Sequence, residues 1–362
     1  MTGSEQRRQV GHVEPVHVGF LGPLAGSGPC GTVRVEMIES VRFKNFKVLK
    51  DTTLPLGRFT LIVGPNGSGK SSAIQGLSAV RNEGNWKVWA SAGLPSDQEV
   101  TVEVRWDGLP PGVVLRGNWI QGGFNQDGSS SRDMVQPVHE TLSRMRKFTF
   151  LPGELARPTQ LRPNVELGTQ GQGLAVVLDQ LRDTDPERFD ELNQELSRWL
   201  PEFNCVLFET SSEGHRSLSL RTRTGKHHVP AAGLSDGTLL ALAFLTLAYI
   251  PNPPPIVCIE EPDHGIHPRL LRDVQDAIYR LCYPDRLVES RPPVQVIATT
   301  HSPYFLDLFR DHREEVVLAH KTGLEARFER LSDRPDAPEI LRDSHLGDAW
   351  YSGILGGVPA ER

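Results

Sequence analysis

The sequence predicts an α/β protein in which a mostly parallel sheet is covered by helices on both faces. Three short apolar segments, at residues 59–63, 256–259 and 294–299, have the length and composition of buried strands. Helical patterns separate them along the chain, and strands that are connected through helices usually run parallel. A glycine-rich turn follows the first of these strands, at the edge where sheets of this kind bind their ligands.

The remaining elements are predicted from periodicity and composition. Residues 37–63 are expected to hold two strands, with a turn at Lys50 and Asp51 and with the second strand ending at residue 63. Helices are expected over residues 71–80, 174–181, 187–200 and 236–250, and a further helix is expected to begin at Pro303. Alternating residues predict strands over 99–106 and 217–224 and a strand pair over 315–320 and 324–331, whereas the Gly, Ser and Asn of residues 122–132 predict a loop.

The composition is that of a globular protein of one large or two ordinary domains. The 362 residues carry a net charge of −6, which does not support a global electrostatic grip on nucleic acid. No apolar run approaches the ~18 residues of a membrane span, and residues 1–8 lack the apolar core of a signal peptide, so we expect no membrane insertion and a cytoplasmic location. Residues 1–35 are expected to be a disordered extension, residues 36–350 the folded unit with an insertion at about 107–230, and residues 351–362 a tail.

A phosphate-loop motif lies at residues 64–71, where GPNGSGKS matches the pattern GxxxxGK[ST] between an apolar strand and a helix. Its glycines allow successive backbone N–H groups to turn toward phosphate oxygens. Lys70 is expected to reach the β and γ phosphates, and the Ser71 hydroxyl to bind Mg²⁺. The sequence therefore predicts ATP and Mg²⁺ as ligands of residues Gly64, Pro65, Asn66, Gly67, Ser68, Gly69, Lys70, Ser71 and Ser72.

Two adjacent carboxylates end the apolar strand at residues 256–259. Because successive strand residues point in opposite directions, Glu260 and Glu261 can have different roles. Glu260 is expected to hold the metal, and Glu261 to orient or deprotonate the water that attacks the γ phosphate. Taken alone, an acidic strand end could instead serve the N-terminus of a following helix.

Polar residues also follow the strand at residues 294–299. His301 is expected to point its imidazole at the γ phosphate, as a second catalytic residue. The alternative is that His301 caps the helix that begins at Pro303.

The hexapeptide GLSDGT at residues 233–238 precedes the apolar helix of residues 236–250. Ser235, Asp236 and Gly237 would offer a hydroxyl, backbone N–H groups and a helix N-terminus, which together make a second anion site. The alternative is an ordinary helix cap at Ser235.

Two local concentrations of positive charge remain. They could follow nucleic-acid phosphates, with Arg221 and Arg223 on one face of a strand, or they could be solvated faces, which the negative net charge favours. Their members are Arg144, Arg146 and Lys147 in one run and Arg216, Arg221, Arg223, Lys226, His227 and His228 in the other.

The order of these motifs resembles the ATPase head of the ATP-binding-cassette type. More narrowly, the chain looks like the soluble AAA family ATPases that are related to the RecF, SMC and OLD families. The resemblance rests on IESVRFKNFKVLKD before GPNGSGKSS, on LSDGTLLALAFLTLA, on IEEPDHGIHP and on ATTHSPYFLDL. It implies a P-loop NTPase fold with a mostly parallel sheet, flanking helices and an additional antiparallel β lobe.

The resemblance also implies roles for individual residues. Ser235, Asp236 and Gly237 would contact the γ phosphate held by the other subunit, Asp263 to His267 would form the crossing D-loop, and His301 would be the switch histidine. Two features depart from the usual pattern, since LSDGT replaces LSGGQ and Glu260 replaces an aspartate. Gln121 and Gln126 are the candidates for the glutamine that contacts the metal.

By this resemblance the protein is expected to hydrolyse ATP in a homodimer that sandwiches two ATP molecules. The dimer would switch an effector protein encoded nearby, in a DNA-related process or in phage defence, and DNA itself is a possible partner. Two other functions stay open at this point. The chain could be the nucleotide-binding subunit of a transporter, or it could be a nucleotide-dependent scaffold for a partner protein.

Overall fold

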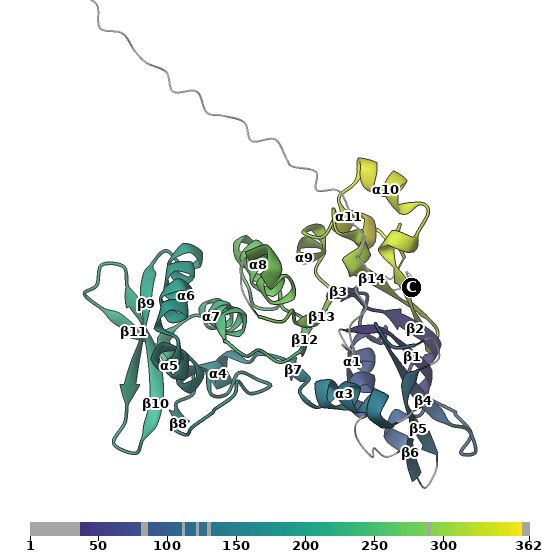
Figure 1. The fold of residues 1–362 in the computed structure, drawn as a ribbon. Coiled ribbons are helices and arrows are strands. Elements are labelled where there is room, and N and C mark those ends of the chain that lie inside the picture. Colours follow the sequence, from purple (N-terminus) through teal and green to yellow (C-terminus); the bar gives the residue numbers. More distant parts are fainter. Residues whose placement is uncertain are drawn as a thin grey trace, which may run out of the picture. The chain divides into compact units, whose positions relative to one another are not determined.

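The computed structural model describes residues 37–80, 86–110, 113–120, 123–128, 132–287 and 291–356, and Figure 1 shows their arrangement. All of these residues fall within one compact unit. The expected extension at residues 1–35 and the last six residues of the expected tail lie outside the described residues.

A six-stranded sheet forms the centre of this unit, in the order β15-β14-β3-β13-β12-β7. The five strands from β14 to β7 pair in parallel, and β15 runs antiparallel to β14. The strands are β3 (Phe59–Val63), β7 (Arg146–Phe148), β12 (Ile256–Glu260), β13 (Gln295–Thr300), β14 (Val316–Thr322) and β15 (Glu325–Arg330). The predicted parallel sheet and the predicted C-terminal strand pair are therefore confirmed.

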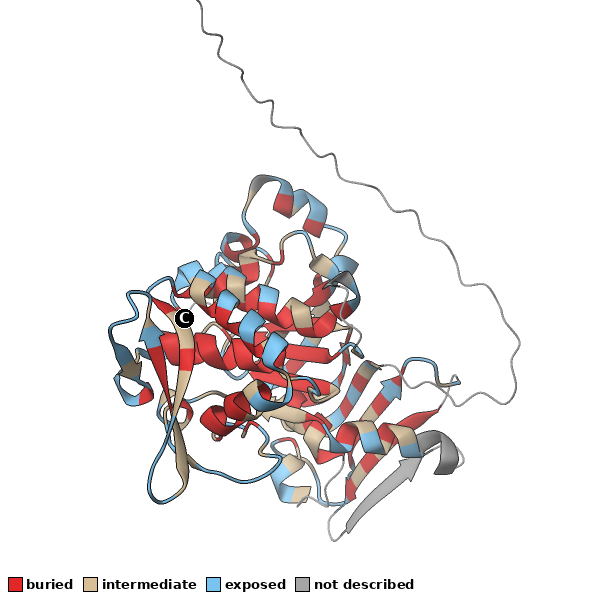
Figure 2. Cartoon of the chain, turned by 60° about the vertical axis from the view of Figure 1, so that its left-hand side comes forward, coloured by how far each residue is buried: buried red, intermediate tan, exposed pale blue. Residues whose placement is uncertain are grey.

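Alternate residues of the central strands face two separate cores. Val257 and Ile259 of β12 join a core that also contains the buried faces of α5, α6, α7 and α8. Cys258 of the same strand joins a second core, which contains α1 and a five-stranded antiparallel sheet. Figure 2 shows the buried residues of the central strands in red between these layers. Helices therefore cover one face, whereas the other face is covered by one helix and a sheet.

The helices predicted over residues 71–80, 174–181, 187–200 and 236–250 are confirmed, and so is the one that begins at Pro303. The apolar helix α7 has every residue from Thr238 to Tyr249 buried, as expected for a helix packed against a sheet on one side and other helices on the other. One core contains α5 (Leu174–Thr184), α6 (Pro186–Trp199), α7 (Asp236–Tyr249) and α8 (Leu271–Cys282). The other core contains α1 (Lys70–Ala79), which follows the phosphate loop. The remaining helices are α2 (Trp86–Trp89), α3 (Arg132–Ser143), α4 (Pro152–Leu155), α9 (Pro303–Asp307), α10 (Ala337–Asp343) and α11 (Leu346–Tyr351).

The antiparallel β lobe has the order β2-β1-β4-β5-β6. Its strands are β1 (Ile38–Phe46), β2 (Leu49–Pro55), β4 (Val100–Trp106), β5 (Val114–Ile120) and β6 (Gly123–Gly128). The predicted turn at Lys50 and Asp51 is wrong, because both residues lie in β2 and the chain turns at Lys47 and Val48. Lys47 has a φ of 53°, and this left-handed residue reverses the chain before β2 begins.

Two further predictions in this lobe are wrong. The second predicted strand is in fact two strands, because β2 belongs to the antiparallel sheet whereas β3 belongs to the central one. The predicted loop at residues 122–132 contains β6, which pairs with β5 along its length. The pairing with β5 overrides the low strand propensity of Gly and Asn, because β-propensity depends strongly on tertiary context.

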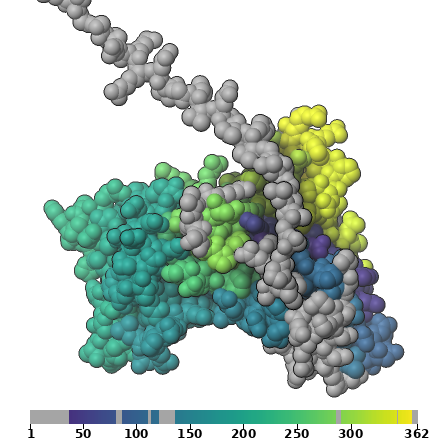
Figure 3. All heavy atoms as spheres, in the orientation of Figure 1, coloured from purple at the N-terminus to yellow at the C-terminus, as the bar shows by residue number. Residues whose placement is uncertain are grey.

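A smaller third sheet packs with α5 and α6. It contains β8 (Thr159–Gln160), β9 (Phe203–Thr210), β10 (His215–Thr222) and β11 (His228–Pro230), with β10 in the middle. Figure 3 shows the residues of this part (teal) on a different region of the surface from the C-terminal helices (yellow). No helix among the described residues is long and apolar enough to span a membrane.

Candidate nucleotide-binding site

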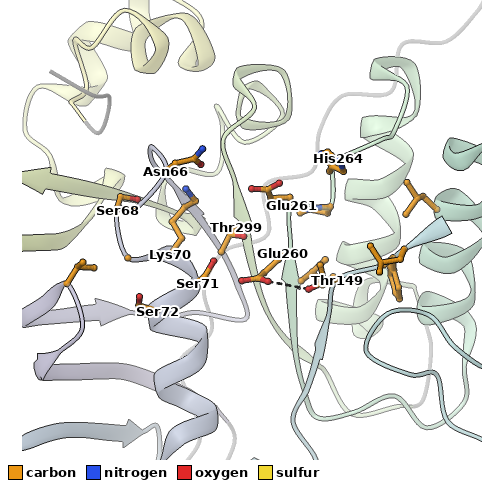
Figure 4. Close-up of a pocket in the computed structure, with 18 of the residues that line it drawn as sticks. Asn66, Ser68, Lys70, Ser71, Ser72, Thr149, Glu260, Glu261, His264 and Thr299 are labelled. Carbon is orange, nitrogen blue, oxygen red and sulfur yellow. Dashed lines mark hydrogen bonds between the residues drawn. The ribbon is translucent and has the colours of Figure 1, made fainter. Parts of the chain in front are cut away.

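The parallel strands end at a common edge of the central sheet, and a pocket of about 510 Å³ lies there. Figure 4 shows the phosphate loop on one side of this pocket and the end of β12 on the other. The lining residues come from the phosphate loop, from the ends of β7, β12 and β13, and from the buried helix α7. They include Asn66, Gly67, Ser68, Gly69, Lys70, Ser71, Ser72, Thr149, Phe150, Glu260, Glu261, His264, Thr299, Leu240 and Phe244.

The phosphate loop has the backbone that its glycines predict. Gly67 and Gly69 have φ values of 76° and 91°, which residues with a side chain rarely adopt. Gly69 is also the residue before helix α1, and a Cβ on it would lie 2.7 Å from the side chain of Leu49. The loop therefore presents the N-terminus of α1 to the pocket, which is the arrangement that binds phosphate.

Lys70 lies folded back over this loop. Its ammonium donates to the carbonyl oxygens of Gly64 at 2.6 Å and Pro65 at 3.0 Å. Burial lowers the pKa of Lys70, and the negative charges of Glu261 and Glu260 oppose that shift. The cation is thus held inside the loop and close to the position where a triphosphate would be bound.

Glu260 stands at the end of β12, and Figure 4 shows its side chain between Ser71 and Thr149. Its Oε2 atom lies 2.7 Å from the Lys147 ammonium and accepts a hydrogen bond of 3.2 Å from the Thr149 hydroxyl. Burial by itself would raise the pKa of Glu260, but the contacts with Lys147 and with the hydroxyls of Ser71 and Thr149 lower it below the usual value. Glu260 is therefore an anion in this site.

The other oxygen of Glu260 tests whether the site suits a divalent cation. Oε1 is buried and makes no hydrogen bond of normal geometry to any residue in the part of the chain that the structure describes. A buried anionic oxygen without a hydrogen bond is costly unless a cation completes its environment. With the Ser71 hydroxyl beside it, Glu260 fits the hard oxygen ligands that Mg²⁺ prefers. Ser71 and Glu260 would hold this ion, which would neutralise phosphate charge.

Glu261 has an unusual backbone and a histidine partner. Its φ of 50° is in the left-handed region, which is rare for a residue with a side chain, and its N–H donates to the Thr299 carbonyl at 2.9 Å. Its Oε1 atom lies 3.0 Å from Nδ1 of His301. The bend separates the two adjacent carboxylates, so that Glu260 contacts Lys147 and Thr149 while Glu261 contacts His301.

The structure also decides what caps helix α9. The Ser302 hydroxyl accepts a hydrogen bond from the Phe305 N–H at 3.3 Å, so Ser302 is the cap. The alternative in which His301 caps this helix is therefore wrong, and the imidazole is directed to Glu261 instead.

The strained backbone of Glu261 gives a prediction for stability. Replacing Glu261 with Ala or with Gly removes the same carboxylate, so the two variants differ mainly in how well they accept a positive φ. We expect Glu261→Gly to have the higher free energy of unfolding, by roughly 1–2 kcal/mol, in urea denaturation. At Glu209, an exposed residue of strand β9, the order should reverse, with Gly the less stable by roughly 0.5–1 kcal/mol. Equal stability of the two variants at residue 261 would mean that its backbone is not strained.

The segment after β12, Asp263 to His267, connects to the segment after β13. The Thr300 hydroxyl donates to Asp263 Oδ1 at 2.7 Å and accepts from the Ser302 N–H at 3.0 Å. Burial raises the pKa of Asp263 above its usual value. Together with the Glu261–His301 contact, these bonds hold the two segments to one another.

The residues of the LSDGT motif do not meet the phosphate loop of the same chain. Ser235 caps helix α7, because its hydroxyl accepts from the Thr238 N–H at 3.2 Å. A Cβ on Gly237 would lie 3.2 Å from the carbonyl oxygen of Gly265, so this turn packs against the segment after β12. Of the described residues of α7, those that line the pocket are Leu240 and Phe244. The pocket of the same chain therefore does not include Ser235, Asp236 or Gly237.

Of the two predicted glutamines, the structure places one, and that one lies away from the metal position. Gln121 lies outside the described residues, and Gln126 lies in β6, paired with Gly117 in the antiparallel lobe. The residue that follows β7 and reaches Glu260 is Thr149, which sequence reasoning missed. The sequence does place Lys147 and Thr149 close together near the end of a short segment, but it does not show that this segment pairs with β12.

The positive residues are largely engaged with protein atoms. Arg146 pairs with Glu166 at 2.9 Å, and Arg216 with Asp179 at 2.7 Å. The prediction that Arg221 and Arg223 share a strand face is wrong, because β10 ends at Thr222. Arg223 instead donates to the carbonyl oxygens of Pro201 and Ser197 at the end of α6. A cation that sequence reasoning did not single out, Lys321 of β14, lies close to the phosphate loop, 3.0 Å from where a Cβ of Gly67 would be.

Comparison with known proteins gives the family. Residues 124–307 match the family described as "AAA domain, putative AbiEii toxin, Type IV TA system", and residues 37–105 match the family described as "AAA ATPase domain". An OLD nuclease from Thermus scotoductus is 33% identical over 96 residues, which are 25% of this chain and 16% of that protein. The chain thus matches only about a sixth of the nuclease.

Two solved structures have the same fold. One is an SMC head bound to the C-terminal winged-helix domain of ScpA, with a TM-score of 0.56 and 16% identity over 81% of this chain and 96% of that chain. The other is an SMC head domain with an extended coiled coil bound to the C-terminal domain of ScpA, from Pyrococcus furiosus, with a TM-score of 0.55 and 14% identity over 84% and 99% of the two chains. These findings show that the chain belongs to the AAA domain family named above, and the two solved structures show that it has the fold of an SMC head.

Proposed function

We propose that this protein hydrolyses ATP to ADP and phosphate with Mg²⁺, in a dimer that ATP holds together. The main support is that Glu261, which contacts His301 at 3.0 Å, lines the same pocket as Lys70, Ser71 and Glu260. Carboxylate, imidazole and phosphate loop together supply what phosphoryl transfer to water requires.

In this proposal each residue has a distinct role. The backbone of the phosphate loop and Lys70 bind the β and γ phosphates, and Ser71 and Glu260 hold Mg²⁺. Glu261 orients the attacking water and accepts its proton, and the left-handed backbone fixes the direction of the carboxylate. His301 holds Glu261 through the 3.0 Å contact and would donate a hydrogen bond to the γ phosphate in the closed dimer.

The dimer accounts for the position of the LSDGT motif. A phosphate loop leaves the γ phosphate open on one side, and the N-terminus of α7 offers the N–H groups and the positive dipole end that would cover it. Because Ser235, Asp236 and Gly237 lie outside the pocket of their own chain, we propose that they complete the pocket of a second chain. Two such contacts related by a two-fold axis close the assembly as a dimer.

We further propose that ATP turnover switches a separate effector protein, in a DNA-related process or in phage defence. The family description names a toxin of a toxin–antitoxin system, and one relative is a nuclease, but the chain matches only 16% of that nuclease. Neither activity is carried over to this chain. The alternatives are a transporter subunit and a nucleotide-dependent scaffold. A scaffold would bind ATP without turnover, and a transporter subunit would purify with a membrane permease.

A complementation experiment tests the composite site. Ser235→Arg should abolish dimerisation and hydrolysis because it places a long cation at the subunit contact, but it should spare ATP binding by the monomer. Lys70→Ala should lose its own ATP site and keep an intact Ser235. An equimolar mixture should therefore recover ATPase activity from one working site per heterodimer, measured as phosphate release. Two inactive proteins that stay inactive when mixed would show that the site is not shared between subunits.

A further inference from the structure

Lys147 is a second lysine at the metal end of the pocket, and no role follows for it from the phosphate-loop motif. It lies on β7 opposite Cys258 of β12, and its ammonium is 2.7 Å from Glu260 Oε2. Both side chains are mostly buried, with 29% of Lys147 and 17% of Glu260 exposed. An ion pair that is so largely removed from solvent interacts more strongly than a surface pair.

The pairing fixes which oxygen of Glu260 is available. Lys147 and the Thr149 hydroxyl both contact Oε2, whereas Oε1 is the buried oxygen without a normal hydrogen bond among the described residues. Lys70, which lines the pocket, is engaged with the carbonyls of its own loop, and Lys147, beside the pocket, is engaged with Glu260.

The consequence is electrostatic. A lysine on one oxygen of a carboxylate reduces the negative potential at the other oxygen and repels any further cation that approaches it. Lys147 also offsets the repulsion between the adjacent carboxylates of Glu260 and Glu261. Lys147 thus offsets part of the negative charge that Glu260 and Glu261 bring to the pocket, and a divalent cation gains less by entering it alone.

Building on the function proposed above, we propose that Lys147 is a resident counter-ion of Glu260. It neutralises much of the charge of the metal-binding carboxylate through Oε2 when no nucleotide is bound, and it weakens the binding of a free divalent cation at Oε1. ATP brings the negative charge that makes the second cation favourable, so the metal is bound together with ATP rather than before it.

The test is a Mn²⁺ titration of the full chain, followed by the electron paramagnetic resonance signal of free Mn²⁺. Lys147→Met keeps the apolar stem and removes the charge, and it should bind Mn²⁺ roughly tenfold or more tightly than the unaltered protein without nucleotide, as expected for the loss of a like charge nearby. Lys147→Gln should give the same direction if Lys147→Met folds poorly, with folding checked by thermal unfolding. Arg146→Met is the matched control, because Arg146 is the neighbouring residue of β7 and pairs with Glu166, whose side chain is 74% exposed. This control should change Mn²⁺ affinity by less than twofold.

A double variant shows whether the effect passes through the proposed ligand. In Glu260→Gln the carboxylate is lost, so adding Lys147→Met to it should no longer increase Mn²⁺ affinity. If Lys147→Met binds Mn²⁺ no more tightly than the unaltered protein, including the case in which neither binds it, the counter-ion role is wrong. The same titration with a non-hydrolysable ATP analogue tests the proposed function separately, because the unaltered protein must bind Mn²⁺ with the analogue for that function to stand.

Discussion

Replacing Glu261 with Gln is expected to lower the kcat of ATP hydrolysis by roughly 10²-fold or more and to leave ATP binding intact. The amide keeps the size of the side chain and can still contact His301, which lies 3.0 Å from the carboxylate. It cannot accept a proton from the attacking water. ATP affinity by calorimetry and phosphate release on the same preparation separate the two effects.

Glu260→Gln is the informative comparison, because the two carboxylates are neighbours in the chain with different contacts. This variant should need more Mg²⁺ for the same rate, since Glu260 is the proposed metal ligand. Should Glu260→Gln instead be the variant that retains ATP and hydrolyses it more slowly, the two roles are reversed. Glu325→Gln, at an exposed ion pair with Lys50, controls for a general effect of losing a carboxylate.

Lys70→Ala should abolish ATP binding. The variant removes the cation that lies within the phosphate loop and that would offset the charge of the triphosphate. Calorimetry with ATP and Mg²⁺ should show no measurable heat of binding for this variant. An affinity equal to that of the unaltered protein would contradict the assignment of the phosphate loop.

Lys50→Ala is a suitable control for this experiment. Lys50 is an exposed lysine of β2 whose ammonium pairs with Glu325 at 2.8 Å, and its loss should leave ATP affinity within about twofold. Circular dichroism of Lys70→Ala distinguishes loss of binding from loss of fold, because Lys70 is itself buried. A folded variant that does not bind ATP is the expected result.

The central sheet could be predicted because its strands are buried on both faces. Every residue of β3 and of β13 is buried, which gives continuous apolar segments in the sequence. The edge strand β6 lacks this signal and was predicted to be a loop. The division between β2 and β3 was also missed, because the chain passes directly from one sheet to the other and periodicity does not report which sheet a strand joins.

The phosphate loop and the two glutamates could be predicted because each follows its strand in an ordered motif. Contacts between distant segments could not. Thr149 and Glu260 are 111 residues apart, and only the parallel pairing of β7 with β12 brings them together. The same pairing places Lys147 beside Glu260, so a residue of a predicted solvated basic run is in fact an ion-pair partner of the proposed metal ligand. The left-handed backbone of Glu261 is likewise set by the fold, since glutamate has no intrinsic preference for it.

The most direct test of the central claim is the mass of the Glu261→Gln variant in solution, measured by light scattering with and without ATP and Mg²⁺. A shared site predicts a monomer without nucleotide and a dimer of twice that mass at saturating ATP, because slow hydrolysis traps the state in which ATP bridges the two chains. The apparent ATP affinity should rise with protein concentration for the same reason. A variant that binds ATP and remains monomeric at every concentration tested would contradict the shared site, and Ser235 would then be no more than the cap of helix α7.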